Sequence, residues 1–321
     1  MLAAYATSID SQDPVSGLTV GDRPEPETRP GWTTVTVKAA SLNHHDLWTL
    51  RGVGIRSEQL PMVLGGDAAG VDEDGNEVVV HSVITSPSWT GDDTLDPKRS
   101  LLSEVYDGTL AEKVVVPSKN LVPKPASLSF EEAACLPTAW LTAYRMLFVK
   151  AQLNPGDTLL IQGAGGGVST ASIALGHATG LRVWVTSRSD SKKRAALALG
   201  AEQAFDVGAR LPGKVDAVID NVGQATWSHS LKSLKPGGVV VTCGATSGPN
   251  PPADLNRVFF LQLRVLGSTM GTRTELERLL SLLDTTGLRP QIDSVYTLSE
   301  TATALKRLDE GDVQGKIVVT P

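Results

Sequence analysis

The sequence has 321 residues, of which 41% are hydrophobic and 20% are charged. These values are typical of a folded globular protein with room for two domains, and they exclude a disordered or fibrous chain. The formal net charge of −6 offers no positive surface for nucleic acid or anionic lipid.

The cysteines and the apolar segments narrow the class of protein further. Cys135 and Cys243 are the only cysteines, too few for a disulfide framework or a cysteine-rich zinc site, so burial as small side chains is the simplest interpretation. Residues 1–6 are too short and lack the basic flank of a signal peptide. No stretch reaches the ~18 apolar residues of a membrane span. We therefore expect a cytoplasmic protein.

Residues 1–125 have the pattern of strands and turns. Apolar and polar residues alternate from 32 to 40, which indicates a half-buried strand. Short β-branched runs predict further strands at 78–83 and 114–116. The segment 82–108 is polar and rich in turn-forming residues, so a long surface loop is expected there.

The pattern changes near residue 126. Ser129 and Glu132 form a capping box, and a helix is expected from there through Val149. Strands and helices then alternate, with predicted strands at 158–162, 182–187, 216–220, 238–243 and 264–268 and predicted helices at 168–179, 190–199 and 224–234. Apolar strands separated by helices indicate a parallel sheet buried on both faces, which is the doubly wound α/β architecture.

The C-terminal part returns to short elements. Thr272 and Glu275 cap another helix, whose leucines form one apolar face. The chain ends in a predicted strand at 316–320, which is expected to rejoin the first domain. The predicted organisation is a discontinuous β-rich domain, residues 1–125 with 286–321, around a dinucleotide-binding α/β domain, residues 126–285.

The strongest local signal is the turn that follows the strand 158–162. Its residues are Gly163, Ala164, Gly165, Gly166, Gly167, Val168 and Ser169. Glycines let the backbone approach a pyrophosphate, and the N–H groups at the start of the next helix bind it. Ser169 stands where G-x-G-x-x-G has its last glycine, and such turns also arise from packing alone.

The end of the second strand of this region bears on the choice of cofactor. NAD-binding proteins usually place an acid about 20 residues after the glycines, to bind the adenine ribose. This chain has Ser187 there, followed by Arg188, Lys192 and Lys193, which suits the 2′-phosphate of NADPH. Two alternatives stay open: these cations are simply solvated, or the nearby Asp190 binds a ribose hydroxyl.

A series of short motifs, each occurring once, follows a fixed order along the whole chain. They are AASLNHHD at 39–46, RG at 51–52, LGGDAAG at 64–70, DGTLAE at 107–112, LPTAWLTAY at 136–144, the glycine turn, LGA at 199–201, KPGG at 235–238 and GKIV at 315–318. In this order and spacing the chain resembles the medium-chain dehydrogenase/reductase superfamily, particularly its quinone oxidoreductase-like members. The resemblance implies a Rossmann domain, a GroES-like catalytic domain and a homodimer.

The same resemblance implies a fold without metal. Zinc-dependent members hold their catalytic zinc with a cysteine, a histidine and a second cysteine or an acid. The corresponding positions here are Asn43, Gly66 and Thr138, none of which is a usual zinc ligand. The cysteines of the family's structural zinc lobe would fall within 82–108, a segment that has no cysteine.

The resemblance also implies which other residues serve the cofactor. It places the nicotinamide in the cleft between the domains, near Asn43, Thr138 and the turn after Cys243. The implied cofactor contacts outside the glycine turn are Asn221, Gly244, Ala245, Thr246 and, at a position where relatives carry a cation for the pyrophosphate, Lys316. For the glycines and threonines, turn geometry is the alternative explanation.

Two adjacent histidines are candidates for chemistry. His45 lies at the family's proton-relay position and His44 where a cation often meets the pyrophosphate. We therefore assign catalytic roles to Asn43 and His45 and a cofactor contact to His44, with polar capping or plain exposure of the histidines as the alternatives. Asp46 is expected to brace the loop by hydrogen bonds, and Trp48 to form a wall of the cleft.

These interpretations predict an NADPH-dependent reductase of a quinone or an activated alkene, because without zinc nothing polarises a plain ketone or alcohol. One alternative is an alcohol dehydrogenase that uses His45 and hydroxyls in place of metal. The other is a non-catalytic protein that binds NADPH or nucleic acid, although the acidity disfavours nucleic acid. Loops 49–62 and 247–262 are expected to shape the substrate pocket, and the strand 264–268 to pair across a two-fold axis.

Overall fold

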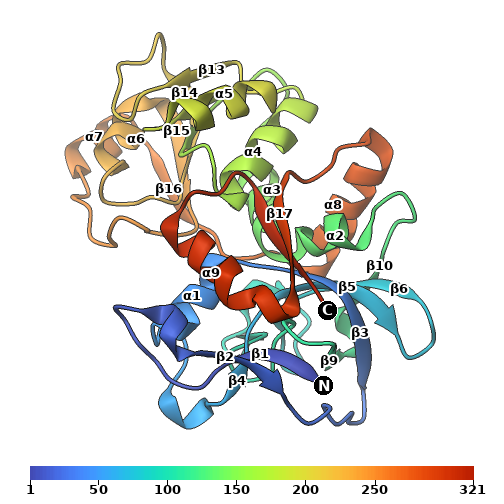
Figure 1. The fold of residues 1–321 in the computed structure, drawn as a ribbon. Coiled ribbons are helices and arrows are strands. Elements are labelled where there is room, and N and C mark those ends of the chain that lie inside the picture. Colours follow the sequence, from blue (N-terminus) through green and yellow to red (C-terminus); the bar gives the residue numbers. More distant parts are fainter. The chain divides into compact units, whose positions relative to one another are not determined.

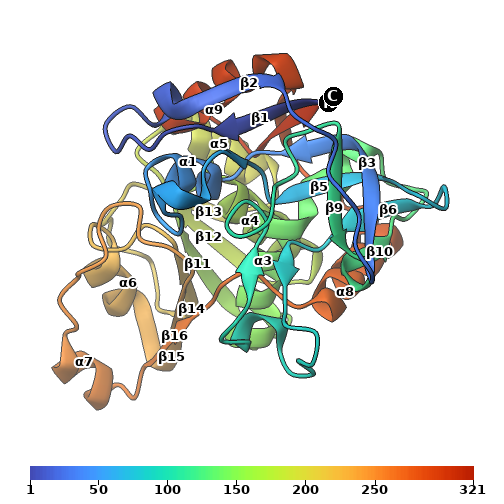
Figure 2. The ribbon, with the colours of Figure 1, turned by 90° about the horizontal axis from the view of Figure 1, so that it is seen from below.

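A computed structural model describes all 321 residues, and the chain in it forms two compact units. Unit 1 consists of residues 1–141 and 270–321, and unit 2 consists of residues 142–269. Each unit has its own sheet system and its own helices (Figures 1 and 2). None of the helices is both long enough and apolar enough to cross a membrane.

Unit 1 is rich in short strands. They are β1 (Leu2–Ala6), β2 (Leu18–Asp22), β3 (Trp32–Ser41), β4 (Met62–Val63), β5 (Asp67–Asp72), β6 (Glu77–Val80), β7 (Val83–Ile84), β8 (Ser100–Leu101), β9 (Lys113–Pro117), β10 (Leu121–Pro123), β17 (Ile292–Thr297) and β18 (Lys316–Thr320). The main sheet has the order β10-β6-β5-β3-β18-β17, with β9 also paired to β3. Its helices are α1 (His44–Leu50), α2 (Phe130–Ala134), α8 (Arg273–Thr286) and α9 (Thr301–Glu310).

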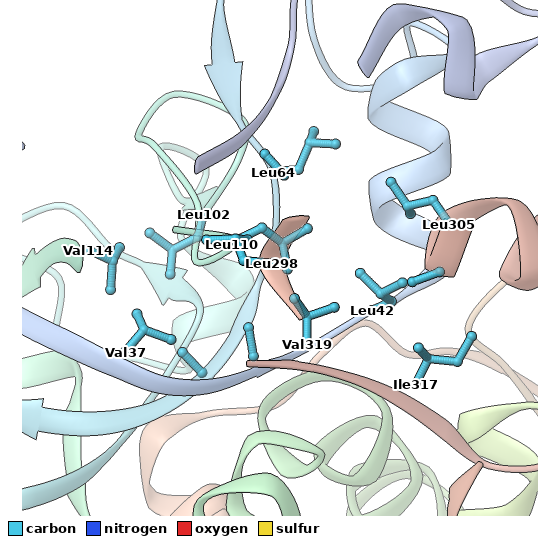
Figure 3. Close-up of a cluster of buried hydrophobic side chains, with 14 of the residues drawn as sticks. Val37, Leu42, Leu64, Leu102, Leu110, Val114, Leu298, Leu305, Ile317 and Val319 are labelled. Carbon is cyan, nitrogen blue, oxygen red and sulfur yellow. The ribbon is translucent and has the colours of Figure 1, made fainter. Parts of the chain in front are cut away.

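The two sequence segments of unit 1 meet in one core. Strand β18 runs antiparallel to β3, with Val318 opposite Ser41, so the C-terminal strand rejoins the N-terminal sheet as predicted. Val35 and Val37 of β3 are buried while Thr36 and Lys38 are exposed, which confirms the predicted alternation. Figure 3 shows the resulting cluster, in which Val37 and Val114 lie with Leu298, Leu305 and Val319 from the C-terminal segment.

Unit 2 is the predicted doubly wound α/β fold. Its strands are β11 (Thr158–Gln162), β12 (Arg182–Thr186), β13 (Gln203–Phe205), β14 (Val215–Asp220), β15 (Leu234–Thr242) and β16 (Arg264–Gly267), and its helices are α4 (Gly167–Ala178), α5 (Asp190–Ala198), α6 (Trp227–Ser233) and α7 (Leu255–Phe260). All strand pairs are parallel, in the order β13-β12-β11-β14-β15-β16. Numbered within the sheet, this is the order 3-2-1-4-5-6 of dinucleotide-binding folds.

Helices cover both faces of the unit 2 sheet. Gly176 of α4 packs so closely on the sheet that a Cβ atom there would lie 2.8 Å from Val183. On the other face, Leu160 and Trp184 pack against Leu231 of α6. Because neighbouring strand residues point to opposite faces, this two-sided burial explains why the strands are apolar throughout.

The helix predicted through Val149 is interrupted. The chain forms α2, a π-helical turn at Leu136–Trp140, α3 (Leu141–Tyr144) and a second π-helical turn at Arg145–Lys150. Pro137 explains the first interruption, because proline lacks the N–H that an α-helix would use. The segment 82–108 is largely loop, as predicted, but contains the paired strands β7 and β8.

The compact units differ from the predicted domain division. Residues 126–141 and 270–285 lie in unit 1, although the pattern change placed them with the nucleotide-binding domain. The reason is packing, since α2 lies against β3 and β5 and α8 lies against β10. A sequence pattern marks where a helix begins, but it does not say which sheet buries the apolar face of that helix.

Candidate functional site

The glycine turn of unit 2 has the geometry of an anion site. Gly163 has φ +94° and donates its N–H to the carbonyl of Thr186 at 3.1 Å, which turns the chain away from the strand. Gly166 is the N-cap of α4 and provides no side-chain cap, so the N–H groups of the first turn, from Gly167, Val168 and Ser169, point to an open helix end. A Cβ atom on the exposed Gly166 would meet nothing within 4 Å.

Ser169 replaces the third glycine of the fingerprint without blocking the turn. Its side chain is buried, and its Oγ lies 3.5 Å from where a Cβ of Gly163 would stand. In the fingerprint that glycine permits close packing of helix on strand. Here Gly176, farther along α4, provides the close approach to β12 instead. The loss of the glycine at 169 therefore leaves the geometry of the site intact.

The end of β12 presents cations and hydroxyls. Ser187 is buried and accepts the N–H of Ser189 at 3.2 Å, while Arg188 is exposed. Ser189 caps α5 at the N–H of Lys192, a half-buried residue. Asp190, which the sequence left as a candidate ribose ligand, is paired with Lys193 at 2.8 Å. The same lysine also pairs with Asp206, which follows β13, so both of these carboxylates are already paired.

Two further loops leave the same edge of the sheet, because the carboxyl ends of parallel strands lie together. Asn221 follows β14, and Gly244, Ala245 and Thr246 follow β15. The loops touch, since the Thr246 N–H points to the carbonyl of Asn221 at 3.4 Å. The turn, the β12 end and these two loops surround the point between β11 and β14 where the strand order reverses, which is where such folds bind ligands.

Asp220 fixes the loop after β14, and sequence reasoning missed it. Its carboxylate is fully buried and accepts the N–H groups of Val222 and Gly223, both at 3.0 Å. It also accepts the hydroxyls of Thr226, the N-cap of α6, and of Ser230 within α6. An acid at the end of an apolar strand could have indicated this role, because a buried carboxylate must accept hydrogen bonds from nearby donors.

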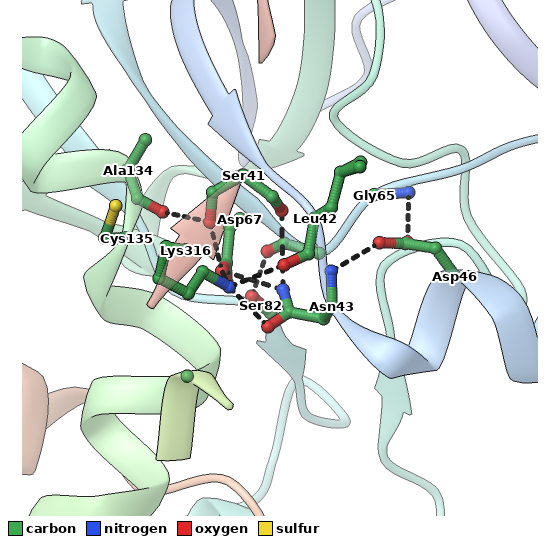
Figure 4. Close-up of polar contacts among 12 residues, drawn as sticks. Ser41, Leu42, Asn43, Asp46, Gly65, Asp67, Ser82, Ala134, Cys135 and Lys316 are labelled. Atoms are coloured by element: carbon green, nitrogen blue, oxygen red, sulfur yellow. Dashed lines mark hydrogen bonds and ion pairs between the residues drawn. The ribbon is translucent and has the colours of Figure 1, made fainter. Parts of the chain in front are cut away.

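In unit 1, side chains from three strands and one helix start meet around Asp67 (Figure 4). This Asp67 cluster consists of Ser41, Asn43, Asp67 and Lys316. Asp67 Oδ2 accepts from Ser41 Oγ and Asn43 Nδ2, each at 2.8 Å, and from Lys316 Nζ at 3.2 Å. The other carboxylate oxygen, Oδ1, is buried without a hydrogen-bond partner.

Lys316, predicted to contact the pyrophosphate, is buried among partners from its own chain. Its side chain is 2% exposed, and its ammonium group donates to Leu42 O at 2.7 Å, Asn43 Oδ1 at 2.6 Å and Asp67 Oδ2. An ammonium group has three N–H bonds, and these acceptors use all of them. In this structure Lys316 is therefore a buried counter-ion of Asp67. This arrangement does not favour the contact with pyrophosphate, which stays a prediction.

The amide group of Asn43 is likewise hydrogen-bonded to other residues of the protein. Its amide oxygen accepts from Lys316, and its Nδ2 faces Asp67 Oδ2 and the carbonyl of Ser41. Asp46 braces the same segment as predicted, since it accepts the N–H of Asn43 at 2.8 Å and that of Gly65 at 3.0 Å. Because the Asn43 amide has no spare N–H, the catalytic donor role predicted for it does not agree with this arrangement.

The three positions that correspond to zinc ligands in relatives hold no ligand cluster. A Cβ on Gly66 would lie 3.6 Å from Thr138 Oγ1 and 3.7 Å from Ser82 Oγ, so glycine and hydroxyls occupy this place. No group of three or more histidine, cysteine, aspartate or glutamate side chains in the structure could hold a metal ion. Thr138 itself is half-buried on the π-helical turn.

The two histidines at the start of α1 have different surroundings. His44 is exposed, and Trp48, one turn later, lies under the guanidinium of Arg51 at 5.6 Å. His45 Nε2 lies 3.2 Å from Glu104 Oε1, and its Nδ1 lies 3.4 Å from Ser103 Oγ. Burial by itself would lower the pKa of His45, but the hydrogen bond to Glu104 and the charges of Asp46, Glu104 and Asp67 outweigh it and raise the pKa.

Two family models match separate parts of the chain. The family model of the alcohol dehydrogenase GroES-like domain matches residues 29–126, and that of the zinc-binding dehydrogenase matches residues 167–285. A crotonyl-CoA reductase of Streptomyces avermitilis is 29% identical over 97% of this chain and 84% of its own length.

Solved structures agree over the full length. An NAD-dependent alcohol dehydrogenase is 34% identical with a TM-score of 0.92, covering 100% of both chains. The 2-octenoyl-CoA carboxylase reductase CinF, solved in complex with NADP and 2-octenoyl-CoA, is 26% identical with a TM-score of 0.91, covering 99% of this chain and 87% of that one. This chain therefore belongs to the medium-chain dehydrogenase/reductase superfamily of oxidoreductases. It combines a GroES-like domain with a Rossmann-type parallel sheet, as predicted.

Proposed function

We propose that this protein is an NADPH-dependent reductase that transfers hydride, without metal, to a quinone or to an activated alkene such as an enone. The observation that carries the proposal is the set of residues at the three zinc-ligand positions of the family. These positions hold the Asn43 amide, which is already hydrogen-bonded within the protein, the glycine Gly66 and the hydroxyl of Thr138. None of them binds zinc in the usual way. A conjugated acceptor needs little Lewis acid, because the charge that arrives with hydride spreads onto its oxygen.

The residues of unit 2 fit NADPH. The open end of α4 suits the pyrophosphate, since Gly166 leaves space and the first-turn N–H groups lack a cap. Ser187, Arg188 and Lys192 suit the 2′-phosphate, because Lys193 pairs with both nearby acids, Asp190 and Asp206. Asn221, Gly244, Ala245 and Thr246 are proposed to line the nicotinamide end. When bound, NADPH supplies the hydride of the reaction.

The residues of unit 1 are proposed to orient the acceptor and to move a proton. Thr138 presents a half-buried hydroxyl beside Gly66, where it can donate to the acceptor's oxygen. Orientation of this kind contributes up to ~7–11 kcal/mol in favourable cases. His45 is proposed to supply the proton that completes the reduction, because its environment favours the charged ring. The Asp67 cluster holds Asn43 and hence the start of the helix that carries His45.

The names of the relatives support reduction of a conjugated double bond without fixing the acceptor. The Streptomyces protein is a crotonyl-CoA reductase, and CinF was solved with an unsaturated acyl-CoA. The structure with 34% identity is named an NAD-dependent alcohol dehydrogenase, which keeps alcohol oxidation as the second candidate. Enoyl-CoA thioesters and simple alcohols therefore belong beside enones and quinones in the test.

The experiment is a turnover panel of these four classes with NADPH and, for the alcohols, NADP⁺. We expect reduction of at least one conjugated acceptor and slow oxidation of alcohols. His45→Ala should lower turnover by roughly 10²-fold and leave the Kd for NADPH nearly unchanged. Fast oxidation of alcohols with no reduction of any conjugated acceptor would overturn the function. Full activity of His45→Ala would instead remove only the proton donor.

We also propose a homodimer formed through the outer edge of the unit 2 sheet. Strand β16 pairs with β15 on one side only, and its Val265 is 45% exposed. The adjoining helix α7 exposes Leu255, Phe259 and Phe260, which are 68–78% exposed. Unpaired strand edges with apolar neighbours favour pairing with a second chain. Val265→Asp should shift the sedimentation coefficient to that of a monomer, and an unmutated protein that sediments as a monomer would disprove the dimer.

A cytoplasmic location is proposed on the cysteines. Cys135 and Cys243 are both free, and burial raises the pKa of each thiol to about 12. Unpaired thiols suit a reducing compartment. Fractionation of the producing cell tests this, and recovery from the secreted fraction alone would contradict it.

A further inference from the structure

A carboxylate from the loop after β8 holds the ring of His45. Glu104 Oε1 lies 3.2 Å from His45 Nε2, and Glu104 Oε2 accepts the N–H of Leu101 at 2.9 Å. Each of the two side chains is 25% exposed. The pair therefore has enough contact with solvent to exchange protons, and enough burial for the two charges to influence each other.

The backbone around Glu104 is fixed by contacts of its own. Ser103 has φ +67°, is fully buried and donates its N–H to the carbonyl of Tyr106 at 2.8 Å. Gln59 donates to the carbonyl of Glu104 at 2.6 Å. A non-glycine residue with positive φ persists only where its surroundings impose it. The direction of the Glu104 side chain is thus set by the loop that carries it.

This contact decides which ring nitrogen of His45 carries which proton. An ionised carboxylate only accepts hydrogen bonds, so Nε2 must be protonated when it faces Glu104. The remaining nitrogen, Nδ1, faces only the Ser103 hydroxyl, at 3.4 Å. When His45 is charged, the Nδ1 proton is therefore the more weakly held of the two, and it is the proton that a substrate oxygen can take.

The charges around the pair favour the ionised form of both partners. On His45, the charges of Asp46, Glu104 and Asp67 act in the same direction as the hydrogen bond and raise the pKa against the effect of burial. On Glu104, burial alone would raise the pKa, but the hydrogen bonds from His45 and Leu101 and the charges of His45 and Arg99 lower it. The ion pair therefore persists to higher pH than a histidine of ordinary pKa would allow, and it is lost first by deprotonation of His45 as the pH rises.

We propose that Glu104 is a positioning residue for the reaction, which holds His45 by Nε2, keeps its ring charged and leaves Nδ1 as the proton donor. The proposal rests on the role of His45 in the proposed function. It assigns a task to a loop that the sequence indicated only as surface. The closest parallel is the acid of a catalytic triad, which fixes the tautomer of a histidine and stabilises its cation without touching substrate.

The first measurement follows the five histidine rings by NMR in labelled protein as the pH is raised, with His45→Gln to assign the His45 signal. Glu104→Gln removes the charge and retains the size of the side chain, so the midpoint of His45 should move to lower pH. Gln59→Ala is the matched control, because it releases the same turn without changing any charge. Its His45 midpoint should stay at the wild-type value.

The second measurement is the pH profile of kcat/KM with a conjugated acceptor. Glu104→Gln should lose about tenfold at about pH 8, where its His45 is neutral, and approach the wild-type value at about pH 5.5. Glu104→Asp keeps the charge and should lose less at the higher pH. A loss that is the same at every pH would indicate a structural role only, and it would overturn the proposal.

The two measurements separate the inference from the function on which it rests. An unchanged His45 midpoint in Glu104→Gln disproves the role of Glu104, whatever the activity does. A midpoint that moves while the pH profile does not shows that His45 is not the donor, and the proposed function loses that assignment together with the positioning role. If Glu104→Gln does not fold, nitrogen shifts of the wild-type ring decide, because a neutral His45 that carries its proton on Nδ1 contradicts the proposal.

Discussion

The glycine turn of unit 2 consists of backbone groups from neighbouring residues, whereas the Asp67 cluster of unit 1 consists of side chains from distant parts of the chain. The turn presents backbone N–H groups from consecutive residues, 163–169, and needs no side chain beyond the small Ser169. The cluster joins side chains from the ends of β3, β5 and β18 and from the N-cap of α1, residues that are up to 275 positions apart (41 to 316). A substitution in the turn should therefore change binding, and a substitution in the cluster should change folding.

Lys316→Met gives the largest expected effect on this comparison. It leaves the buried Asp67 without its counter-ion, so the free energy of unfolding should fall by about 3–5 kcal/mol, measured by urea denaturation. Lys119→Met, which removes an exposed lysine bonded to Thr85, is the control and should change stability by no more than about 0.5 kcal/mol. If Lys316→Met kept its stability and lost only affinity for NADPH, the original assignment to pyrophosphate would be right.

Gly166→Asp tests the turn in the opposite sense. Gly166 has φ −73° and open space around it, so the new side chain fits and caps α4 without cost to stability. Its carboxylate occupies the anion site, and NADPH should bind at least about tenfold more weakly, or about 1.4 kcal/mol. Gly166→Asn caps equally well without charge and should lose less affinity. Titration calorimetry measures the affinity for NADPH, and a melting curve measures the stability. Unchanged affinity in Gly166→Asp would show that the pyrophosphate does not bind at this turn.

Arg188→Glu has a smaller expected effect, confined to the choice between cofactors. The unmutated protein should bind NADPH about tenfold more tightly than NADH, because Arg188 is exposed beside Ser187 and Asp190 is held by Lys193. Arg188→Glu should erase that preference. Arg194→Glu, at an exposed position on α5, reverses an equal charge farther from the strand end and should retain the preference. Equal dissociation constants in the unmutated protein would refute the prediction.

Removal of metal ions by a chelator is expected to have no effect on turnover. Asn43, Gly66 and Thr138 provide neither thiolate nor imidazole, so purified protein should contain far less than one zinc ion per chain by elemental analysis. Turnover should survive prolonged dialysis against a strong chelator. One zinc ion per chain, lost together with activity, would mean that other residues of the chain bind a catalytic metal.

Sequence reasoning succeeded where the signal is local. The strands 158–162 and 316–320 have the predicted bounds, because runs of buried apolar residues mark both of them. The capping boxes at Ser129 and Thr272 begin helices as predicted. The order of motifs led to the family, and the spacing of the glycines located the turn, since both are properties of short stretches of chain.

Sequence reasoning could not identify contacts between residues that lie far apart in the chain. The sequence around Lys316 is the same whether its side chain faces a phosphate or Asp67. The pairing of β18 with β3 is what brings Lys316 to Asp67. Glu104 could not be linked to His45, because the positive φ of Ser103 and the bond from Gln59 set its direction. The compact units place α8 with unit 1 for a related reason, since the apolar face of a helix does not show in the sequence which sheet it covers.

The open N-terminus of α4 also has a consequence for motion. A helix whose first N–H groups lack a cap frays, so in the ligand-free protein the amides of Gly167, Val168 and Ser169 should exchange with deuterium far faster than those of the buried Ala171 and Ile173. A bound pyrophosphate would satisfy these groups and slow their exchange. The cofactor then acts as the missing cap of its own helix, and its binding should be visible as order gained in one helical turn before any substrate is added.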